Sequence, residues 1–239
     1  MRTSARLPAV VRGLPAVVLA LLVSGCAGSD APESPAASAA PTPLTEERAA
    51  AVASASLLTE ADLPGYTGAE RVSDDTAATA ALERCLGREA AATRVLAEAK
   101  SQEISKGGDA DAVQVQSETQ VVKDAATAAA DLAVLQGPEG ARCLEDLFDA
   151  QIGTPGASTS EPLQVSTPPG AQGAFGHALT ITVTDGKRKA TFPVEVVGAV
   201  AGSAEVQVST FAVAEPLPAA ERDRLLALAV ERAVQAQAG

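Results

Sequence analysis

Residues 178–200 read Ala-Leu-Thr-Ile-Thr-Val-Thr-Asp-Gly-Lys-Arg-Lys-Ala-Thr-Phe-Pro-Val-Glu-Val-Val-Gly-Ala-Val. Apolar and polar residues alternate through Ala178–Thr184, as they do in a strand with one buried face. Asp185-Gly186 is a strong signal for a tight hairpin turn. Pro193 has no N–H for a ladder, so it indicates an edge or a bulge in the return strand, Lys189–Val200. The stretch predicts a β-hairpin whose return strand turns three apolar side chains to one face: Phe192, Val194 and Val196.

The segments around this hairpin predict more strands, with helices before, between and after them. Strands are expected at Tyr66–Val72, Ala112–Val122, Leu163–Thr167 and Ala204–Val213, with a loop at Gly153–Pro162. Helices are expected at Thr45–Ala55, Asp74–Gly87, Glu89–Ala99, Asp124–Gln136, Glu139–Ile152 and Pro218–Gln235. Because Val206 and Val208 are out of phase with Phe211, we expect a bulge near Ser209-Thr210. The fold class is therefore predicted as α+β, a curved antiparallel sheet with helices packed mainly on one face.

The amino-terminal segment indicates export. Three arginines and no acid precede the apolar run Gly13–Val23, which is shorter than the ~20 residues of a membrane-spanning helix. Val23-Ser24-Gly25-Cys26 then resembles the lipobox of bacterial lipoproteins. In that family the cysteine sulfur receives a diacylglycerol carrying acyl chains such as palmitate, and cleavage leaves the cysteine as the first residue. The alternative is an ordinary signal peptide with an incidental cysteine.

The lipobox interpretation divides the chain into three parts. Residues 1–25 are expected to be a signal peptide, and residues 26–43 a lipidated Cys26 followed by a tether rich in Ala, Ser and Pro. Residues 44–239 are expected to form one α+β domain. The protein would then be held by its lipid at the extracytoplasmic face of the cell membrane.

Composition narrows the possible partners. The chain of 239 residues has a net charge of −12, with 30 acidic and 18 basic residues, so nucleic acid is not an expected partner. Four Phe, one Tyr and no Trp offer few rings for stacking on sugars or bases. The expected partners are the membrane, through the lipid, and a small envelope ligand or a protein.

The three cysteines have distinct expected roles. With Cys26 lipidated, Cys85 and Cys143 remain in an oxidising compartment, where two remaining cysteines predict one disulfide. The alternative is a pair of buried free thiols. A bridge would join two helices and would leave no thiol for catalysis or for a metal.

The segment Leu57–Thr67, which reads Leu-Leu-Thr-Glu-Ala-Asp-Leu-Pro-Gly-Tyr-Thr, resembles the opening motif of actinobacterial sensor-domain lipoproteins. These are similar to the extracellular domain of PknH-type serine/threonine kinases. The family order of parts would place its elements here at Cys85, Val113–Val122, Asp124–Gln136, Cys143, Ala178–Val213 and Pro218–Gln235. The resemblance implies a non-catalytic module that senses or binds a ligand, with a cleft on the sheet proposed as the binding site.

Candidate catalytic and metal-binding residues are few. His177 is the single histidine, expected at a turn or on the surface, and no Gly-x-Ser-x-Gly elbow accompanies it. Asp109 and Asp111 in a glycine loop suggest calcium weakly, and a solvated hairpin loop is the preferred interpretation. Asp74-Asp75 is interpreted as helix capping. We therefore expect no enzyme activity, no metal and no cofactor.

Two functional hypotheses remain, with an unrecognised hydrolase as a distant third. One is a lipid-anchored sensing or binding module, and the other is a carrier of an apolar envelope ligand such as a lipid. The apolar face of the helix Asp124–Gln136 consists mainly of small residues: Ala125, Ala128, Ala129, Leu132 and Leu135. Small residues there either leave room for an apolar ligand or let the helix pack closely on the sheet, and the second interpretation is preferred. A shallow polar cleft would favour the sensor, an open apolar cavity the carrier, and acids around His177 the hydrolase.

Overall fold

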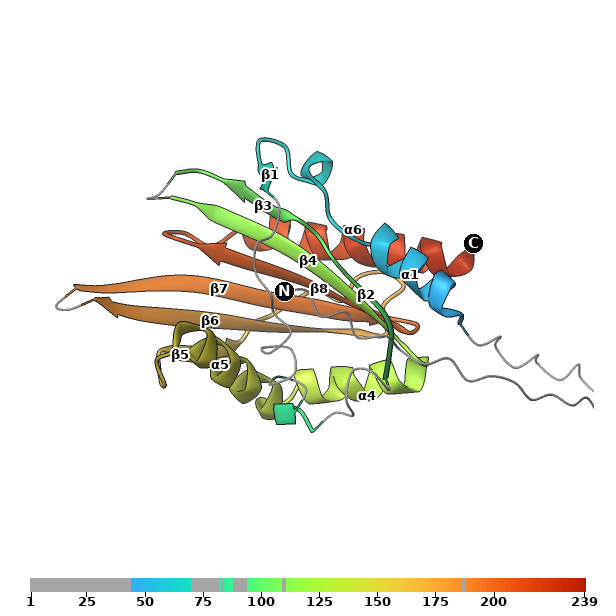
Figure 1. Ribbon diagram of the computed structural model, residues 1–239. Coiled ribbons are helices and arrows are strands. Elements are labelled where there is room, and N and C mark those ends of the chain that lie inside the picture. Colours follow the sequence, from blue (N-terminus) through green and yellow to red (C-terminus); the bar gives the residue numbers. More distant parts are fainter. Residues whose placement is uncertain (1–43, 70–81, 83, 88–93, 109–110, 186–187) are drawn as a thin grey trace, which may run out of the picture. The chain divides into compact units, whose positions relative to one another are not determined.

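The structure, a computed structural model, contains an antiparallel sheet of eight strands in its described residues (Figure 1). It describes residues 44–69, 82, 84–87, 94–108, 111–185 and 188–239. The predicted signal peptide, Cys26 and the tether lie outside this range. The strands are β1 (Thr67–Ala69), β2 (Val95–Lys100), β3 (Glu103–Lys106), β4 (Val113–Val122), β5 (Ser158–Pro162), β6 (Gly173–Asp185), β7 (Arg188–Ala201) and β8 (Ala204–Ala212).

The strand order is β1-β3-β4-β8-β7-β6-β5. Strand β4 has two neighbours on its outer edge, because β3 pairs with its first residues and β2 with its last. The predicted hairpin is confirmed as β6 and β7, which pair from Asp185↔Arg188 to Gly173↔Val200. Pro193 lies just before the part of β7 that pairs with β8, so the missing N–H costs no bond on that side.

Helices cover both faces of the sheet, so the prediction of helices mainly on one face is wrong. Helices α1 (Glu46–Ala55) and α6 (Ala219–Ala238) pack on one face, and α4 (Ala125–Leu135) and α5 (Pro138–Ile152) on the other (Figure 1). The reason lies in β7, which is apolar on both sides. Its odd-numbered residues from Val197 to Ala201 join the core under α1 and α6, and Val194, Val196 and Val200 join the core under α4 and α5. A strand buried on both faces needs cover on both.

Three other sequence predictions are corrected. The helix expected at Glu89–Ala99 is strand β2 from Val95 onward, where pairing with β4 prevails over the helix propensity of Leu, Ala and Lys. Leu163–Thr167 is not a strand. The strand of this region is β5, which lies within the expected loop Gly153–Pro162 and pairs with β6 as a polar edge strand. The bulge near Ser209-Thr210 is absent, because β8 pairs without a register shift with both neighbours.

The helix ends and the disulfide agree with the sequence. Thr45 and Asp124 cap α1 and α4 by accepting backbone N–H groups with their side chains. Cys85 and Cys143 form a disulfide with Cα atoms 5.6 Å apart, and it ties the helical turn at Cys85 to α5. On α4, Ala128 and Leu132 are buried, whereas Ala125 and Ala129 are exposed. Within the described residues, no helix is long and apolar enough to cross a membrane.

Candidate functional site

The candidate site is a cleft of about 280 Å³ on the sheet face that carries α4 and α5. These helices contact β5, β6 and β7 far more than β4 and β8, so the cleft forms where their cover ends. It is slightly smaller than typical ligand pockets of roughly 300–1,000 Å³. The described polar residues that line it are Lys100, Glu103, Gln114, Gln116, Ser117, Glu118, Gln120, Gln151, Glu205, Gln207, Ser209 and Thr210.

The floor of the cleft changes from polar to apolar across the strands. Strand β4 presents Gln114, Gln116, Glu118 and Gln120 in a row. The ladder sets these residues opposite Phe211, Ser209, Gln207 and Glu205 of β8. Strand β7 then presents Val194 and Val196 beside Phe211 and Ser209. Because side chains two apart in a strand share a face, a ligand on this floor would meet amides at one end and aliphatic groups at the other.

The opposite wall of the cleft is apolar. Leu144, Leu147 and Phe148 reach it from α5, and Leu135 reaches it from α4. All four phenylalanines of the chain belong to the core cluster on this face: Phe148, Phe175, Phe192 and Phe211. The Phe192 and Phe211 rings stack with centroids 5.5 Å apart, so Phe192 supports the ring that lines the cleft.

Gly198 of β7 makes room for the Phe175 ring of β6, which also lines the cleft. A Cβ atom on Gly198 would lie 2.4 Å from Cε1 of Phe175 and 2.9 Å from the Val206 carbonyl oxygen. No real Cβ fits at these distances, so any side chain here would move the ring or the backbone. The glycine is therefore required by the close approach of an aromatic ring to the sheet.

The glutamine amides of the floor differ in how they are used. The amide of Gln120 donates to Glu98 and Glu118, at 3.2 Å each, and its oxygen accepts from Arg94 at 3.4 Å. Gln207 donates to Ser209 at 3.2 Å. In contrast, the amides of Gln114 and Gln116 have no hydrogen-bond partner among the described residues. They are half-buried donors and acceptors that a ligand can use.

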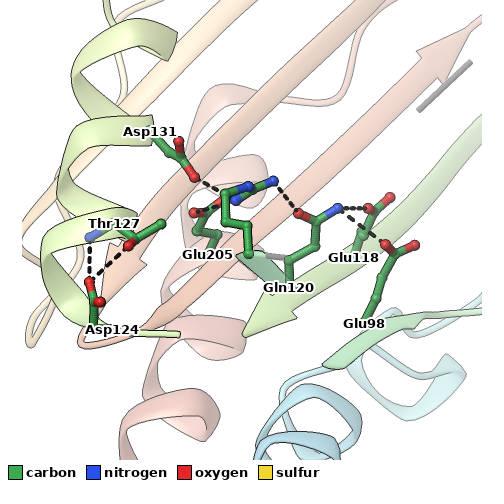
Figure 2. A network of polar contacts seen from close by, with 8 residues as sticks. Glu98, Glu118, Gln120, Asp124, Thr127, Asp131 and Glu205 are labelled. Atoms are coloured by element: carbon green, nitrogen blue, oxygen red, sulfur yellow. Dashed lines mark hydrogen bonds and ion pairs between the residues drawn. The ribbon is translucent and has the colours of Figure 1, made fainter. Parts of the chain in front are cut away.

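A buried ionic network closes one end of the floor. The Arg94 guanidinium, 3% exposed, lies 2.5 Å from Asp131 of α4 and 3.3 Å from Glu205 of β8. Arg94 also donates to the Gln120 side chain. Figure 2 shows Asp131, Glu205 and Gln120 close to one another, with Glu118 and Glu98 beyond Gln120. The network links α4 to β4 and β8, so it fixes how far the helix layer stands from the polar strands. Buried charges need partners of this kind, because each is costly without one.

Lys100 neutralises part of the acidity beside this network. Its ammonium lies 3.0 Å from Glu98 and 3.4 Å from Glu118. Burial raises the pKa of Glu118 above its ordinary value, while the charge of Lys100 acts in the opposite direction. These charged groups are thus engaged with one another, and apart from Glu103 the unused hydrogen-bonding capacity of the described lining belongs to neutral side chains.

His177, the one candidate catalytic residue, is not part of the cleft. It is 3% exposed within β6, so the expectation of a turn or surface position is wrong. Its Nε2 donates to the Leu135 carbonyl oxygen at 2.7 Å, which makes it a link between the sheet and α4. Among the described residues, no acid contacts it by a hydrogen bond or an ion pair. The convergence that would favour a hydrolase is therefore not found there.

The candidate metal residues also have structural roles where they are described. The Asp111 carboxylate accepts the Gly108 N–H at 2.7 Å, as a hairpin-loop residue does. Asp109, Asp74 and Asp75 lie outside the described residues. Within the parts of the chain that are described, no three His, Cys, Asp or Glu side chains are grouped to hold a metal ion.

The Leu57–Thr67 motif folds onto the carboxy-terminal helix instead of lining the cleft. Asp62 accepts two hydrogen bonds from Arg232 of α6, at 2.6 and 2.8 Å, and one from the Thr59 N–H at 2.8 Å. Arg224 of α6 donates to the Asp62 carbonyl oxygen at 2.8 Å. The hydrogen bonds from Arg232 hold the pKa of Asp62 below its ordinary value. The aspartate of the motif is therefore a structural anchor.

Comparison with known proteins gives one likeness to report. No family model matches the sequence, and no curated protein matches it. The structure resembles the crystal structure of the extracellular domain of PknH from Mycobacterium tuberculosis. The two chains are 15% identical, the match covers 81% of this chain and 98% of that chain, and the TM-score is 0.45. This is the kind of domain that the Leu57–Thr67 motif and the order of elements resemble.

Proposed function

We propose that this protein is a lipid-anchored extracytoplasmic lipoprotein whose domain binds a small ligand in the cleft and performs no chemistry on it. One observation carries the proposal: half-buried amides on β4 and β8, two of them without partners among the described residues, face a wall of Leu and Phe side chains. Ligand sites typically combine apolar walls with polar groups placed to fix the orientation of the ligand. The ligand would be sensed or held, in keeping with a binding module.

The compartment rests on separate features. The disulfide between Cys85 and Cys143 suits an oxidising environment outside the cytoplasm. The basic and apolar leader with the lipobox at Cys26 supplies export and the anchor. Replacing Cys26 by alanine should abolish labelling with radioactive palmitate and move the protein from the membrane fraction to the soluble fraction. Continued labelling of the Cys26→Ala variant would contradict the anchor.

Native mass spectrometry tests ligand binding. The mature lipoprotein is purified from washed envelopes, and the spectrum is recorded before and after denaturation. We expect a bound mass that denaturation releases, and we expect Phe211→Ala to lose most of it. Val234→Ala is the matched control, since Val234 is an exposed apolar residue of α6. A wild-type protein with no bound mass would contradict a tightly held ligand, and equal loss in both variants would contradict the cleft.

A carrier of an apolar envelope ligand such as a lipid is the second candidate, and the apolar wall of α5 is the observation that favours it. The polar floor counts against it, because amides covered by a hydrocarbon would lose water and gain no hydrogen bond. The identity of the released mass separates the two candidates: a small molecule rich in hydrogen-bonding groups supports the binding module, and a lipid whose bulk is hydrocarbon supports the carrier.

A further inference from the structure

We propose that the cleft binds an uncharged amphiphile, a short apolar group attached to a head of hydroxyl or amide groups. The head would meet the amides of Gln114, Gln116 and Gln207, and the apolar group would lie against Phe148 and Phe211. This inference rests on the proposed function and adds to it the chemical class of the ligand.

The head group follows from the state of the floor. An amide offers two donors and an acceptor without net charge. Gln114 and Gln116 make no hydrogen bond to the described residues, and the oxygen of Gln207 accepts none there. Hydroxyl and amide groups satisfy such side chains in both directions, so they are the natural occupants of this row.

The charges at the cleft disfavour an ionic head. Three of the lining residues are glutamates, Glu103, Glu118 and Glu205, and one is a lysine, Lys100. An anion would therefore be repelled. A cation would find Glu118 and Glu205 already paired with Lys100 and Arg94. An anion would lose water without gaining a counter-charge, and a cation would gain only Glu103, the lining glutamate that pairs with no described cation. An uncharged head is therefore favoured over a cation, and a cation over an anion.

The apolar part must be short. The cavity of about 280 Å³ lies at the lower limit for ligand pockets, and an apolar group in it would lie between the wall of α5 and the Phe211 ring of the floor. Each methylene group that such a wall buries strengthens binding by roughly fourfold. A chain of six carbons gives a measurable effect while its amphiphiles stay monomeric in solution.

The test compares three probes that share a hexyl chain: hexyl glucoside, hexyltrimethylammonium and hexyl phosphate. The protein is the chain from residue 26 with Cys26→Ser, which removes the anchor and nothing described in the structure. Shifts of the glutamine side-chain N–H signals in NMR titrations report binding. We expect hexyl glucoside to bind about tenfold more tightly than hexyl phosphate, with the cation between them.

Two leucine variants locate the effect. Gln116→Leu should weaken the binding of hexyl glucoside about fivefold, which corresponds to the loss of about one neutral hydrogen bond. It should weaken the binding of hexyl phosphate much less. Gln235→Leu should change neither, because Gln235 is exposed on α6. Equal or tighter binding of hexyl phosphate would overturn the uncharged class and leave ligand binding intact. Binding by none of the three would also overturn the class, and the proposed function falls only if the envelope-purified protein also carries no bound mass.

Discussion

Asp62 gives a stability prediction whose size follows from the structure. Its carboxylate is 8% exposed and receives two hydrogen bonds from the Arg232 guanidinium, which is 29% exposed. A third bond comes from the Thr59 N–H. In Asp62→Asn, one oxygen becomes an NH₂ group, so a donor must face another donor whichever way the amide turns. Losing one charge-assisted bond and leaving another group unsatisfied should lower the free energy of unfolding by about 2 kcal/mol.

The pH dependence of this difference has a definite sign. The pKa of Asp62 is held below its ordinary value of 3.8, chiefly by the hydrogen bonds from Arg232. Because the pKa of Asp62 is lower in the folded state than in the unfolded state, its carboxylate stabilises the folded state fully at pH values above the unfolded-state pKa. This stabilisation is lost as the pH falls through the folded-state pKa. The difference between wild type and Asp62→Asn should therefore be full at pH 7 and shrink below pH 3.8.

Urea unfolding at a series of pH values between 7 and 3 measures the difference. The matched control is Glu139→Gln, which breaks an ion pair with Arg142 whose side chains are 60% and 61% exposed. Exposed pairs contribute about 0.2–1 kcal/mol, so this variant should stay near wild type. The reasoning is refuted if Asp62→Asn loses no more stability than Glu139→Gln, or if its deficit does not shrink at acid pH.

Three further predictions concern the core and the cleft. Replacing both Cys85 and Cys143 by serine should lower the free energy of unfolding by about 4 kcal/mol, because the bridge closes a loop of 58 residues. Thermal unfolding should show a Tm lower by about 10 °C. An unchanged Tm would mean that the bridge contributes nothing. Asp131→Ala removes the nearest partner of buried Arg94 and should lower the free energy of unfolding, measured in urea, by about 3 kcal/mol. A loss below 1 kcal/mol would contradict a stabilising role for the Arg94 ionic network. Burial raises the pKa of Glu118 in the folded state, so wild type gains stability when this carboxylate takes up a proton. The free energy of unfolding of Glu118→Gln, relative to that of wild type, should therefore be highest at pH 7 and decrease as the pH falls toward 4.5. The opposite trend in urea titrations would refute this.

Local patterns account for the parts of the fold that were predicted correctly. The alternation through Ala178–Thr184 and the Asp185-Gly186 turn specify a hairpin over a few residues. Thr45 and Asp124 cap the amino-terminal ends of α1 and α4 by accepting hydrogen bonds from backbone N–H groups three residues further along the chain. The pairing of Cys85 with Cys143 follows from the number of cysteines.

Elements whose state depends on distant partners were missed. Val95–Lys100 has a helical composition, and only the neighbouring edge of β4 makes it a strand. Phe211 suggested a bulge because one core was assumed. With a second core under α4 and α5, a regular strand turns Phe211 to one face and Val206 and Val208 to the other.

The family resemblance implies a cleft on the sheet, but the residues that line it were not predicted, for the same reason. The alternation of residues in β4 places Gln114, Gln116 and Glu118 on one face of the strand, but it does not say whether that face is open to solvent or covered. Which part of a polar face is open and which is walled depends on how far α5 extends over the sheet. No spacing within β4 carries that information. A signal was present in β8, where Phe211 and Gln207 share the polar face.

The most direct test of the cleft as the ligand site is to block it with a bulky label. Ser209→Cys places a single free thiol on the cleft floor, since Cys85 and Cys143 are bridged and Cys26 is expected to carry lipid. Thr180→Cys places one on the exposed side of β6 as the control. Each variant is purified from envelopes, treated with a fluorescein maleimide and examined by native mass spectrometry. We predict that labelled Ser209→Cys has lost the bound mass while labelled Thr180→Cys retains it; a labelled Ser209→Cys protein that still carries its full complement of ligand would contradict the account.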